Sequence, residues 1–485
     1  MTGWANPGID LHLDLGAGRG VRARLEQALR QAVRDGRLAP GTQLPSSRVL
    51  AQDLGVARNT VKDVYDQLVA EGWLTARQGS GTRVARETFA EPSHSKTAPM
   101  VSTPEELAES CHGQDYPYDL RSGSPDLSSF PREVWLAASR RALAAAPYEA
   151  FGYTDPRGRL ELRESLAEYL ARVRGVRTTP ELIVVCSGFV QAIGLLGRAL
   201  YKVGGRQIAV EALGLPDPPT ILRDAGLETV QLSLDADGAR VDQLTGEDAA
   251  LLTPSHQFPT GAAMPPARRT AAVAWACEHG ALIVEDDYDG EFRYDRQPVG
   301  AIQGLAPHHV AYAGTTSKSL APGLRLGWLV LPPHLLEQII REKHLADRHS
   351  SVFDQLTLAE LIASGGYDRH VRHMRARYRR RRDQLVTALG QHAPHVRVSG
   401  IAAGLHAVLK LPADGPTEAE LVACAQQQGL ALEGMASFGN DTGPALVVGY
   451  GTPPEHAFAG ALERLCAVLE TTGARSHRGW SPQRP

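Results

Sequence analysis

The sequence predicts an α/β protein with a small, mainly helical N-terminal domain and a larger body built on a mixed, mainly parallel sheet. At roughly 100 to 200 residues per domain, 485 residues suffice for two or three domains. Residues 86–114 form a break rich in Pro, Ser, Thr and Glu, and beyond it short β-branched runs alternate with helix-length segments. The composition, 43% apolar and 22% charged, excludes a mostly disordered or fibrous protein.

Charge, cysteine content and apolar runs indicate which partners and which compartment are expected. The net charge is only −3, but residues 1–85 hold eleven Arg and Lys against eight Asp and Glu, a weak indication that this part faces nucleic acid. The five cysteines are far apart and form no CxxC pair, so neither disulfides nor a metal site is predicted, and the thiols are expected to be buried. No apolar run approaches the roughly 18 residues that cross a bilayer, and no signal peptide is evident, so a cytoplasmic protein without a membrane role is predicted.

The order of the predicted elements divides the chain into three parts. Residues 1–85 are predicted to form one domain, 86–114 an exposed linker, and 115–475 the body. In the body, the runs at 182–186, 207–210, 281–285 and 310–313 are predicted strands separated by helices. The sheet is therefore expected to be mostly parallel, with its site outside the carboxyl ends of the strands. From about Leu335, long helical stretches and then a mixed pattern predict a smaller C-terminal lobe.

The N-terminal domain has helix-turn-helix spacing. A first helix before Gly36 is predicted by apolar residues at every fourth position: Val21, Leu25, Leu29 and Val33. Ser46 or Ser47 can cap a second helix, Gly55 makes the turn, and a third helix opens near Ala57. Residues 72–84 predict a two-stranded ribbon with glycines at its tip.

The third helix is predicted to have an apolar inner face (Val61, Val64 and Leu68) and a polar outer face. One interpretation of the outer face is a solvated surface of a small helical domain. The ordered set of a helix, a P-S-S-R helix, an A-R-N-T-V helix and a glycine-tipped ribbon over residues 18–85 resembles the winged helix-turn-helix of the GntR family of bacterial regulators. The resemblance implies promoter DNA as a partner, contacted by the third helix and by the ribbon tip in the minor groove. The residues that match the DNA-contacting positions are Arg48, Arg58, Asn59, Thr60, Lys62, Gln78 and Gly79.

Three predicted strand ends in the body carry complementary chemical groups. Lys318 follows a strand among small hydroxyl residues and is a candidate amine for an imine with an aldehyde cofactor. Asp286, in Glu285-Asp-Asp-Tyr-Asp, is suited to keep the ring nitrogen of pyridoxal phosphate protonated. The turn at Ser187-Gly188 offers free amides for a phosphate, and Arg325 is close enough in sequence to Lys318 to reach the same pocket. Taken singly, each group has an ordinary explanation as a turn, a solvated loop or a surface lysine.

The order and spacing of these groups over residues 118–470 resemble the fold type I aminotransferases, which depend on pyridoxal 5'-phosphate. Behind a GntR-type head, the whole resembles the MocR-type regulators, a group with GABA-sensing (GabR) and vitamin-B6-sensing (PdxR) members. The resemblance implies a homodimer in which Lys318 is the Schiff-base lysine and Asp286 the partner of the pyridine nitrogen. Tyr288 is implied as a neighbour of the ring hydroxyl, and Tyr153 as a residue that reaches the phosphate of a partner subunit. The implied phosphate-binding residues are Gly188, Phe189, Val190 and Arg325.

Three departures from the aminotransferase pattern affect the expected function. Phe258 stands where an asparagine usually contacts the ring hydroxyl, and His256 is the candidate replacement, although a lone histidine is as often structural. Leu215 takes the position of the stacking aromatic, and Val447 that of the arginine that pairs a substrate carboxylate. We therefore expect a transcriptional regulator whose small-molecule effector is pyridoxal phosphate or a related ligand, with control of vitamin B6 metabolism as one role. The alternatives are a working aminotransferase with an appended DNA-binding domain, and a regulator that senses an amino acid.

A dense run of arginines lies between Tyr367 and Leu385. Such a run can bind DNA phosphate, but it is more often a solvated helix between lobes. Met374, Tyr378 and Leu385 are predicted to form the packing stripe of that helix.

Overall fold

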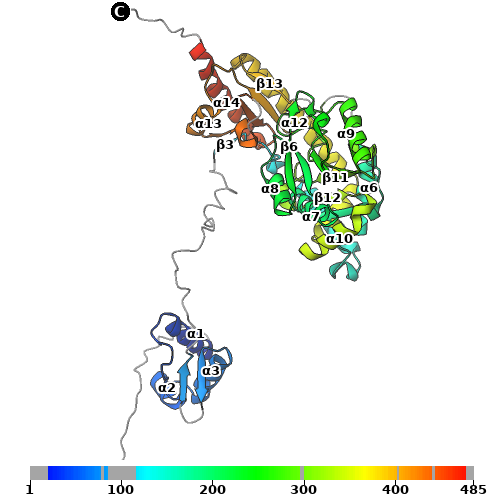
Figure 1. Ribbon diagram of the computed structural model, residues 1–485. Helices are drawn as coiled ribbons and strands as arrows, with labels where there is room; N and C mark the ends of the chain where they lie inside the picture. Colours follow the sequence, from blue (N-terminus) through cyan, green and yellow to red (C-terminus); the bar gives the residue numbers. More distant parts are fainter. Residues whose placement is uncertain are drawn as a thin grey trace, which may run out of the picture. The chain divides into compact units, whose positions relative to one another are not determined.

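The computed structural model describes residues 20–77, 81–85, 116–294, 300–400, 403–439 and 443–476. The chain divides between Gly113 and Gln114 into two compact units, here called the head and the body (Figure 1). The predicted linker at 86–114 lies outside the described residues. Within the parts of the chain that the structure describes, no helix is long and apolar enough to cross a membrane.

The head consists of three helices and a two-stranded ribbon: α1 (Val21–Arg34), α2 (Ser47–Leu54), α3 (Arg58–Ala70), β1 (Leu74–Arg77) and β2 (Gly81–Val84). Ser46 caps α2 by accepting a hydrogen bond from the Val49 amide, and Gly55 ends α2 in the left-handed region with φ 64°. The two strands pair antiparallel, with Leu74 opposite Val84. The predicted winged helix-turn-helix is therefore confirmed.

The core of the head is formed by the inner faces of its helices. Val61, Val64 and Leu68 of α3 are fully buried, as the sequence pattern predicts. Leu25 and Leu29 of α1 pack against them in the same cluster. Val21, in the first turn of the predicted helix α1, is 38% exposed.

The body is built on a seven-stranded sheet in the order β4-β12-β11-β10-β9-β5-β6. The strands span Ile183–Cys186 (β4), Gly327–Val330 (β12), Val310–Thr315 (β11), Leu282–Asp287 (β10), Ala249–Leu252 (β9), Gln207–Glu211 (β5) and Glu228–Leu232 (β6). Strand β12 runs antiparallel to both of its neighbours, and the other strands share one direction. The predicted mixed, mainly parallel sheet is confirmed, and so are its four predicted strands.

Helices cover both faces of this sheet, because neighbouring residues of a strand point to opposite sides. On one face Val184 and Cys186 pack with α7 (Phe189–Lys202), α8 (Asp217–Asp224) and α10 (Pro333–Asp347). On the other face Ile183 and Val185 pack with α6 (Leu160–Arg174) and α11 (Val352–Ala363). The part of that face near Ile283 packs with α9 (Pro266–His279). Helix α5 (Arg132–Ala145) adds to the layer of α6 and α11.

The smaller C-terminal lobe has a second sheet of four strands in the order β13-β14-β17-β16. The elements of this lobe are β13 (Arg397–Ser399), β14 (His406–Lys410), α13 (Glu418–Gln427), β15 (Leu430–Ala431), β16 (Glu433–Gly434), β17 (Ala445–Gly449) and α14 (Glu455–Ser476). The long helix α12 (Gly366–His392) leads into it, and β3 (Tyr118–Asp119) pairs with β15. Met374, Tyr378 and Leu385 of α12 are buried in the core of this lobe, which confirms the predicted packing stripe.

The cysteines follow the expectation of burial only in part. Cys186 and Cys466 are buried, but Cys277, which lies on α9, is exposed. The expectation is wrong for Cys277, because its position on the amphipathic helix falls outside the packed face. Cys111 lies outside the described residues.

Candidate functional site

A cavity of about 280 Å³ opens at the carboxyl ends of the parallel strands, close in size to small-molecule sites. The carboxyl-terminal parts of strands β5, β10 and β11 contribute Glu211, Asp286 and Thr315 to its lining. Other residues in its lining are Gly123, Phe189, Val190, Leu215, Phe258, Tyr288, Asp289, Ser317, Lys318, Arg325 and His406. The structure thus brings most of the predicted cofactor residues into one cavity.

Lys318 lies in the segment between β11 and the short helix at Pro322–Leu324. The segment is held by a bond of 2.9 Å between the hydroxyl oxygens of Thr315 and Ser317. The Lys318 Nζ donates a hydrogen bond to the carbonyl oxygen of Gly123. Burial lowers the pKa of Lys318, while the carboxylates of Asp289 and Asp286 act in the opposite direction. A lowered pKa increases the neutral fraction of the amine, which is the nucleophilic form.

The carboxylates at the end of β10 have different surroundings. The pair Arg174–Asp287, with its closest atoms 2.6 Å apart, is buried, and the Tyr312 hydroxyl also donates to Asp287. Glu285 accepts hydrogen bonds from two backbone amides. Asp286 faces the cavity, and its side chain makes no hydrogen bond within the described part of the chain. Burial raises the pKa of Asp286 well above its usual range, and the charge of Asp287 adds to the effect. A carboxylate in this position is stabilised by a cationic N–H donor in the cavity.

The first residues of α7 and Arg325 line the same cavity. The first amides of an α-helix have no partner within the helix and attract anions. Arg325 has a left-handed backbone, φ 52°, and its guanidinium donates a hydrogen bond of 2.6 Å to the Ser187 carbonyl. Gly188 permits this approach, because a Cβ at that position would lie 3.1 Å from an Arg325 nitrogen. Phe189 is half-buried and Val190 is half-exposed at the rim.

The Tyr288 hydroxyl lies at the cavity and donates to the His256 carbonyl oxygen at 3.0 Å. His256 itself is buried behind Tyr288, where its Nδ1 lies 2.8 Å from an Asp289 oxygen. The centroid of its ring lies 4.9 Å from that of His406. His406 lines the cavity, whereas the predicted residue His256 is not part of the lining. Burial lowers the pKa of His406 to about 3, so this ring is neutral at physiological pH. The structure thus places His256 as a support for Tyr288 and Asp289.

The positions that depart from the aminotransferase pattern differ in their surroundings. Phe258 lines the cavity with its ring edge-on to Tyr288, at 6.1 Å between centroids. Leu215 is half-exposed at the cavity rim. Val447 is fully buried in β17, in a cluster of apolar side chains that includes Phe258.

Tyr153 does not line the cavity of its own chain. It is 82% exposed on the body, with the Arg348 guanidinium over its ring.

The cavity residues that the sequence reasoning did not name as site candidates include Gly123, Glu211, Asp289 and His406. Asp289 and Glu211 follow predicted strands, which is a usable signal for them. Gly123 and His406 come from elements distant in sequence, and only packing brings them to the cavity. Glu211 accepts hydrogen bonds from Thr253, so its carboxylate is held at the cavity wall.

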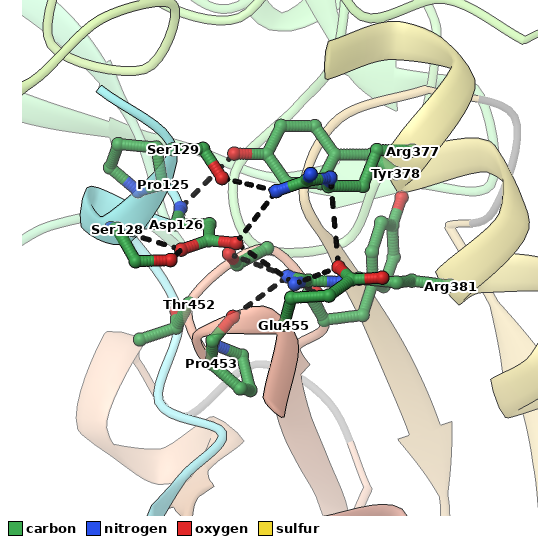
Figure 2. A network of polar contacts seen from close by, with 12 residues as sticks. Pro125, Asp126, Ser128, Ser129, Arg377, Tyr378, Arg381, Thr452, Pro453 and Glu455 are labelled. Atoms are coloured by element: carbon green, nitrogen blue, oxygen red, sulfur yellow. Dashed lines mark hydrogen bonds and ion pairs between the residues drawn. The ribbon is translucent and has the colours of Figure 1, made fainter. Parts of the chain in front are cut away.

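The segment that contains Gly123 is fixed to the C-terminal lobe by a buried charge network (Figure 2). Asp126 lies 2.9 Å from Arg381, and both residues are 2% exposed. Arg377 also pairs with Asp126, and Figure 2 shows Glu455 across from both arginines. The Thr452 hydroxyl donates to the Arg121 carbonyl at 2.6 Å. These contacts join residues 121–126 to α12 and to the start of α14.

The polar residues of the second and third helices of the head lie on its surface. Arg48, Arg58, Asn59 and Lys62 are exposed, and Thr60 is half-buried. No hydrogen bond or ion pair among the described residues uses the side chains of the four exposed residues, so they remain available to a ligand. Gln78 and Gly79 lie outside the described residues.

Comparison with known proteins supports the two-part organisation. Residues 21–84 match the bacterial regulatory proteins of the gntR family, and residues 118–440 match aminotransferase class I and II. The chain is 32% identical over 451 residues to the HTH-type pyridoxine biosynthesis transcriptional regulator PdxR of Corynebacterium glutamicum, covering 92% of this chain and 95% of that one. It is 31% identical over 481 residues to the probable rhizopine catabolism regulatory protein MocR of Rhizobium meliloti, covering 96% and 97%.

Solved structures that the body resembles include several aminotransferases. The multiple substrate aminotransferase of Thermococcus profundus matches with a TM-score of 0.68 and 25% identity, over 78% of this chain and 96% of that one. The chain therefore belongs to the MocR-type, helix-turn-helix transcriptional regulators of the GntR family, which carry an aminotransferase-like domain.

Proposed function

We propose that this DNA-binding regulator uses the cavity of its aminotransferase-like domain as a sensor for pyridoxal 5'-phosphate. The observation that carries the proposal is the pairing, in one cavity, of the Lys318 amine with an Asp286 carboxylate that has no hydrogen-bond partner among the described residues. An anion-binding end at α7 and Arg325 completes the set. The similarity to the pyridoxine biosynthesis regulator supports a role in control of vitamin B6 metabolism.

The residues of the cavity fit the groups of this cofactor. Pyridoxal phosphate supplies an aldehyde that condenses reversibly with a primary amine, on a ring that draws electrons. Lys318 would hold the aldehyde carbon, and Asp286 would keep the ring nitrogen protonated. The α7 amides and Arg325 would hold the phosphate, and Tyr288 would contact the ring hydroxyl. Leu215 has no aromatic face to stack on the ring, which favours reversible binding.

The proposed effector has no α-carboxylate. A buried carboxylate needs a cationic partner, and leaving it unpaired costs several kcal/mol. The lysine and arginine side chains among the described cavity residues are Lys318 and Arg325, and both would hold the cofactor. Val447 cannot supply one, since its side chain is apolar and fully buried. These observations favour pyridoxal phosphate over an amino acid as effector, and regulation over transamination.

We further propose that the protein is a homodimer. Four aromatic side chains of the body are exposed, and a second copy of the chain could bury them. They are Tyr148, Phe151, Tyr153 and Phe353, which are 92%, 51%, 82% and 51% exposed. Phe151 and Phe353 lie side by side, with ring centroids 5.9 Å apart. Tyr153 would then reach the phosphate site of the partner, and two heads would read two half-sites of promoter DNA.

The bond between Lys318 and Gly123 suggests how occupancy is communicated. Capture of an aldehyde uses the amine that now donates to the Gly123 carbonyl. Gly123 belongs to the first described segment of the body, which follows directly from the proposed linker at 86–114. Loss of this bond would release one attachment of that segment. The segment would then have two states, with and without the bond, and pyridoxal phosphate would shift their equilibrium because it binds the state without the bond more tightly.

The test is to titrate operator binding by the full chain with pyridoxal phosphate, and then with a panel of amino acids at saturating cofactor. The operator would come from mapping where the protein binds its own genome, with and without pyridoxal phosphate. We expect pyridoxal phosphate alone to change the affinity for the operator. A response that requires an amino acid and is accompanied by a change in the cofactor's absorption would contradict the proposal.

Asp286→Asn is expected to weaken binding of pyridoxal phosphate about 10- to 150-fold, because a charge-assisted hydrogen bond of about 1.5 to 3 kcal/mol is lost. The measurement is equilibrium binding followed by absorption. Asp237→Asn, an exposed carboxylate away from the cavity, is the matched control. Equal affinity of the Asp286 variant and the control would remove Asp286 from the site.

In the head, Arg58→Ala is expected to cost about 1 to 3 kcal/mol of operator binding and to relax specificity if it contacts a base edge. Lys62→Ala is expected mainly to reduce the salt dependence, by about one unit of slope, if it contacts a phosphate. Both effects are measured by titrating the full chain at several salt concentrations. Wild-type binding by the double variant would show that α3 does not read the DNA.

A further inference from the structure

The arginine-rich helix α12 carries more positive charge than the packing of the body uses. Its eight arginines are Arg369, Arg372, Arg375, Arg377, Arg379, Arg380, Arg381 and Arg382. Arg381 is buried, and Arg377 pairs with Asp126 next to it (Figure 2). Arg375 donates to the Glu291 carbonyl, and Arg382 pairs with Asp383. These four side chains are engaged within the body.

The remaining four arginines, here called the arginine stripe, are Arg369, Arg372, Arg379 and Arg380, and all are exposed. With 3.6 residues per turn they fall within a sector of about 100° on α12. The opposite side of the helix holds the buried Met374, Tyr378 and Leu385. The stripe is therefore one continuous outer face, fixed in orientation by the packing behind it.

Nearby acids do not neutralise the arginine stripe. Asp368 pairs with Arg172 at 2.8 Å, and Asp383 pairs with Arg382 at 2.5 Å, so both acids of α12 are matched by arginines outside the stripe. Arg369 donates to a backbone carbonyl, which leaves its charge in place. Within the described residues, no ion pair involves a stripe arginine.

We propose that the arginine stripe of α12 binds the phosphates of duplex DNA that flanks the operator. Arginine forms bidentate hydrogen bonds with phosphate, and α12 contains no lysine. From Arg369 to Arg380 the helix advances about 16 Å, comparable with several phosphates of one strand at about 3.4 Å of DNA axis each. The family of the chain supplies the partner, because the head belongs to a class of DNA-binding regulators.

The chain between the two units is long enough for the body to reach DNA beside the site that the head binds. Residues 86–115 separate the described parts of the head and the body, and an extended chain of thirty residues spans at most about 100 Å. That distance corresponds to about 30 base pairs at 3.4 Å each. The proposal does not depend on pyridoxal phosphate, since no residue of the stripe lines the cavity within the described structure.

The test compares two duplexes with the full chain. The short duplex is the shortest that the full chain still binds specifically, and the long one adds about 40 base pairs on each side, beyond the reach estimated above. The stripe variant is Arg372→Gln, Arg379→Gln and Arg380→Gln together. The matched control changes three exposed arginines elsewhere on the body, Arg223→Gln, Arg341→Gln and Arg397→Gln.

For the stripe variant on the long duplex, we expect affinity to fall at least about tenfold near physiological salt. The slope of log affinity against log salt should fall by about 2 to 3, close to 0.9 for each phosphate that the variant no longer neutralises. On the short duplex, the variant and the control should bind like the wild type. Equal loss on both duplexes, equal loss in the control, or wild-type binding throughout would each overturn the proposal. A change in sedimentation of the variant with unchanged DNA binding would also overturn it, and would assign the stripe to a protein interface.

Discussion

Replacing Lys318 with alanine is expected to abolish covalent capture of pyridoxal phosphate. The Lys318 amine lies in the cavity with Asp286, and burial lowers its pKa, so among the described lysines it is the one best prepared to react at neutral pH. The measurement is borohydride reduction of the protein with pyridoxal phosphate, followed by mass spectrometry of the labelled peptide. Labelling in the wild type should concentrate at Lys318, and in the variant it should fall to the background of surface lysines.

The matched control is Lys410→Ala, which removes an exposed lysine from β14. This variant should be labelled at Lys318 like the wild type. A visible absorption band of equal strength in the Lys318 variant and the control would refute the assignment of Lys318. Retained operator binding by the Lys318 variant, without a response to pyridoxal phosphate, would show that the head still functions and that only sensing is lost.

Asp126→Ala is expected to destabilise the body by about 3 to 5 kcal/mol, because it leaves buried positive charge without its partner. Arg381 is 2% exposed, and Asp126 is its buried carboxylate. Arg381 also donates to the Pro453 carbonyl at 2.8 Å, so the side chain cannot leave without breaking other contacts. Glu455 remains as a partner, but its side chain is 58% exposed and screened by water. The measurement is denaturant unfolding of the full chain.

Two further variants separate charge from packing. Asp383→Ala removes an exposed carboxylate from α12, the helix that carries Arg381. This variant should change the free energy of unfolding by no more than about 0.5 kcal/mol. The double variant Asp126→Ala with Arg381→Met removes both buried charges and should recover more than half of the lost stability, since an apolar side chain of similar size needs no partner. If Asp126→Ala is as mild as Asp383→Ala, the network shown in Figure 2 does not stabilise the body.

The sequence alone determined the helices of the head, four strands of the main sheet and the meeting of Lys318 with Asp286 in one cavity. Apolar spacing and caps located the head helices, because these signals lie within a few residues of each other. The placement of Asp286 and Lys318 in one cavity followed from topology, since the carboxyl ends of parallel strands meet at the same edge of a sheet. The position of the turn at Gly188 could be predicted for the same reason, because this turn follows strand β4. Local pattern and general sheet geometry were sufficient for these residues.

Only the tertiary structure decided which side chains are paired across long distances in sequence. Gly123 contacts Lys318 across 195 residues, and Asp126 contacts Arg381 across 255. The sequence pattern likewise could not show that His256 lies behind Tyr288, or that Val447 is buried among apolar side chains. In α12 the helical period separates an inner from an outer face, but it does not show which arginines have partners. Periodicity fixes the face of an element on which a residue lies, whereas its contacts depend on how whole elements pack, and packing is determined by the entire chain.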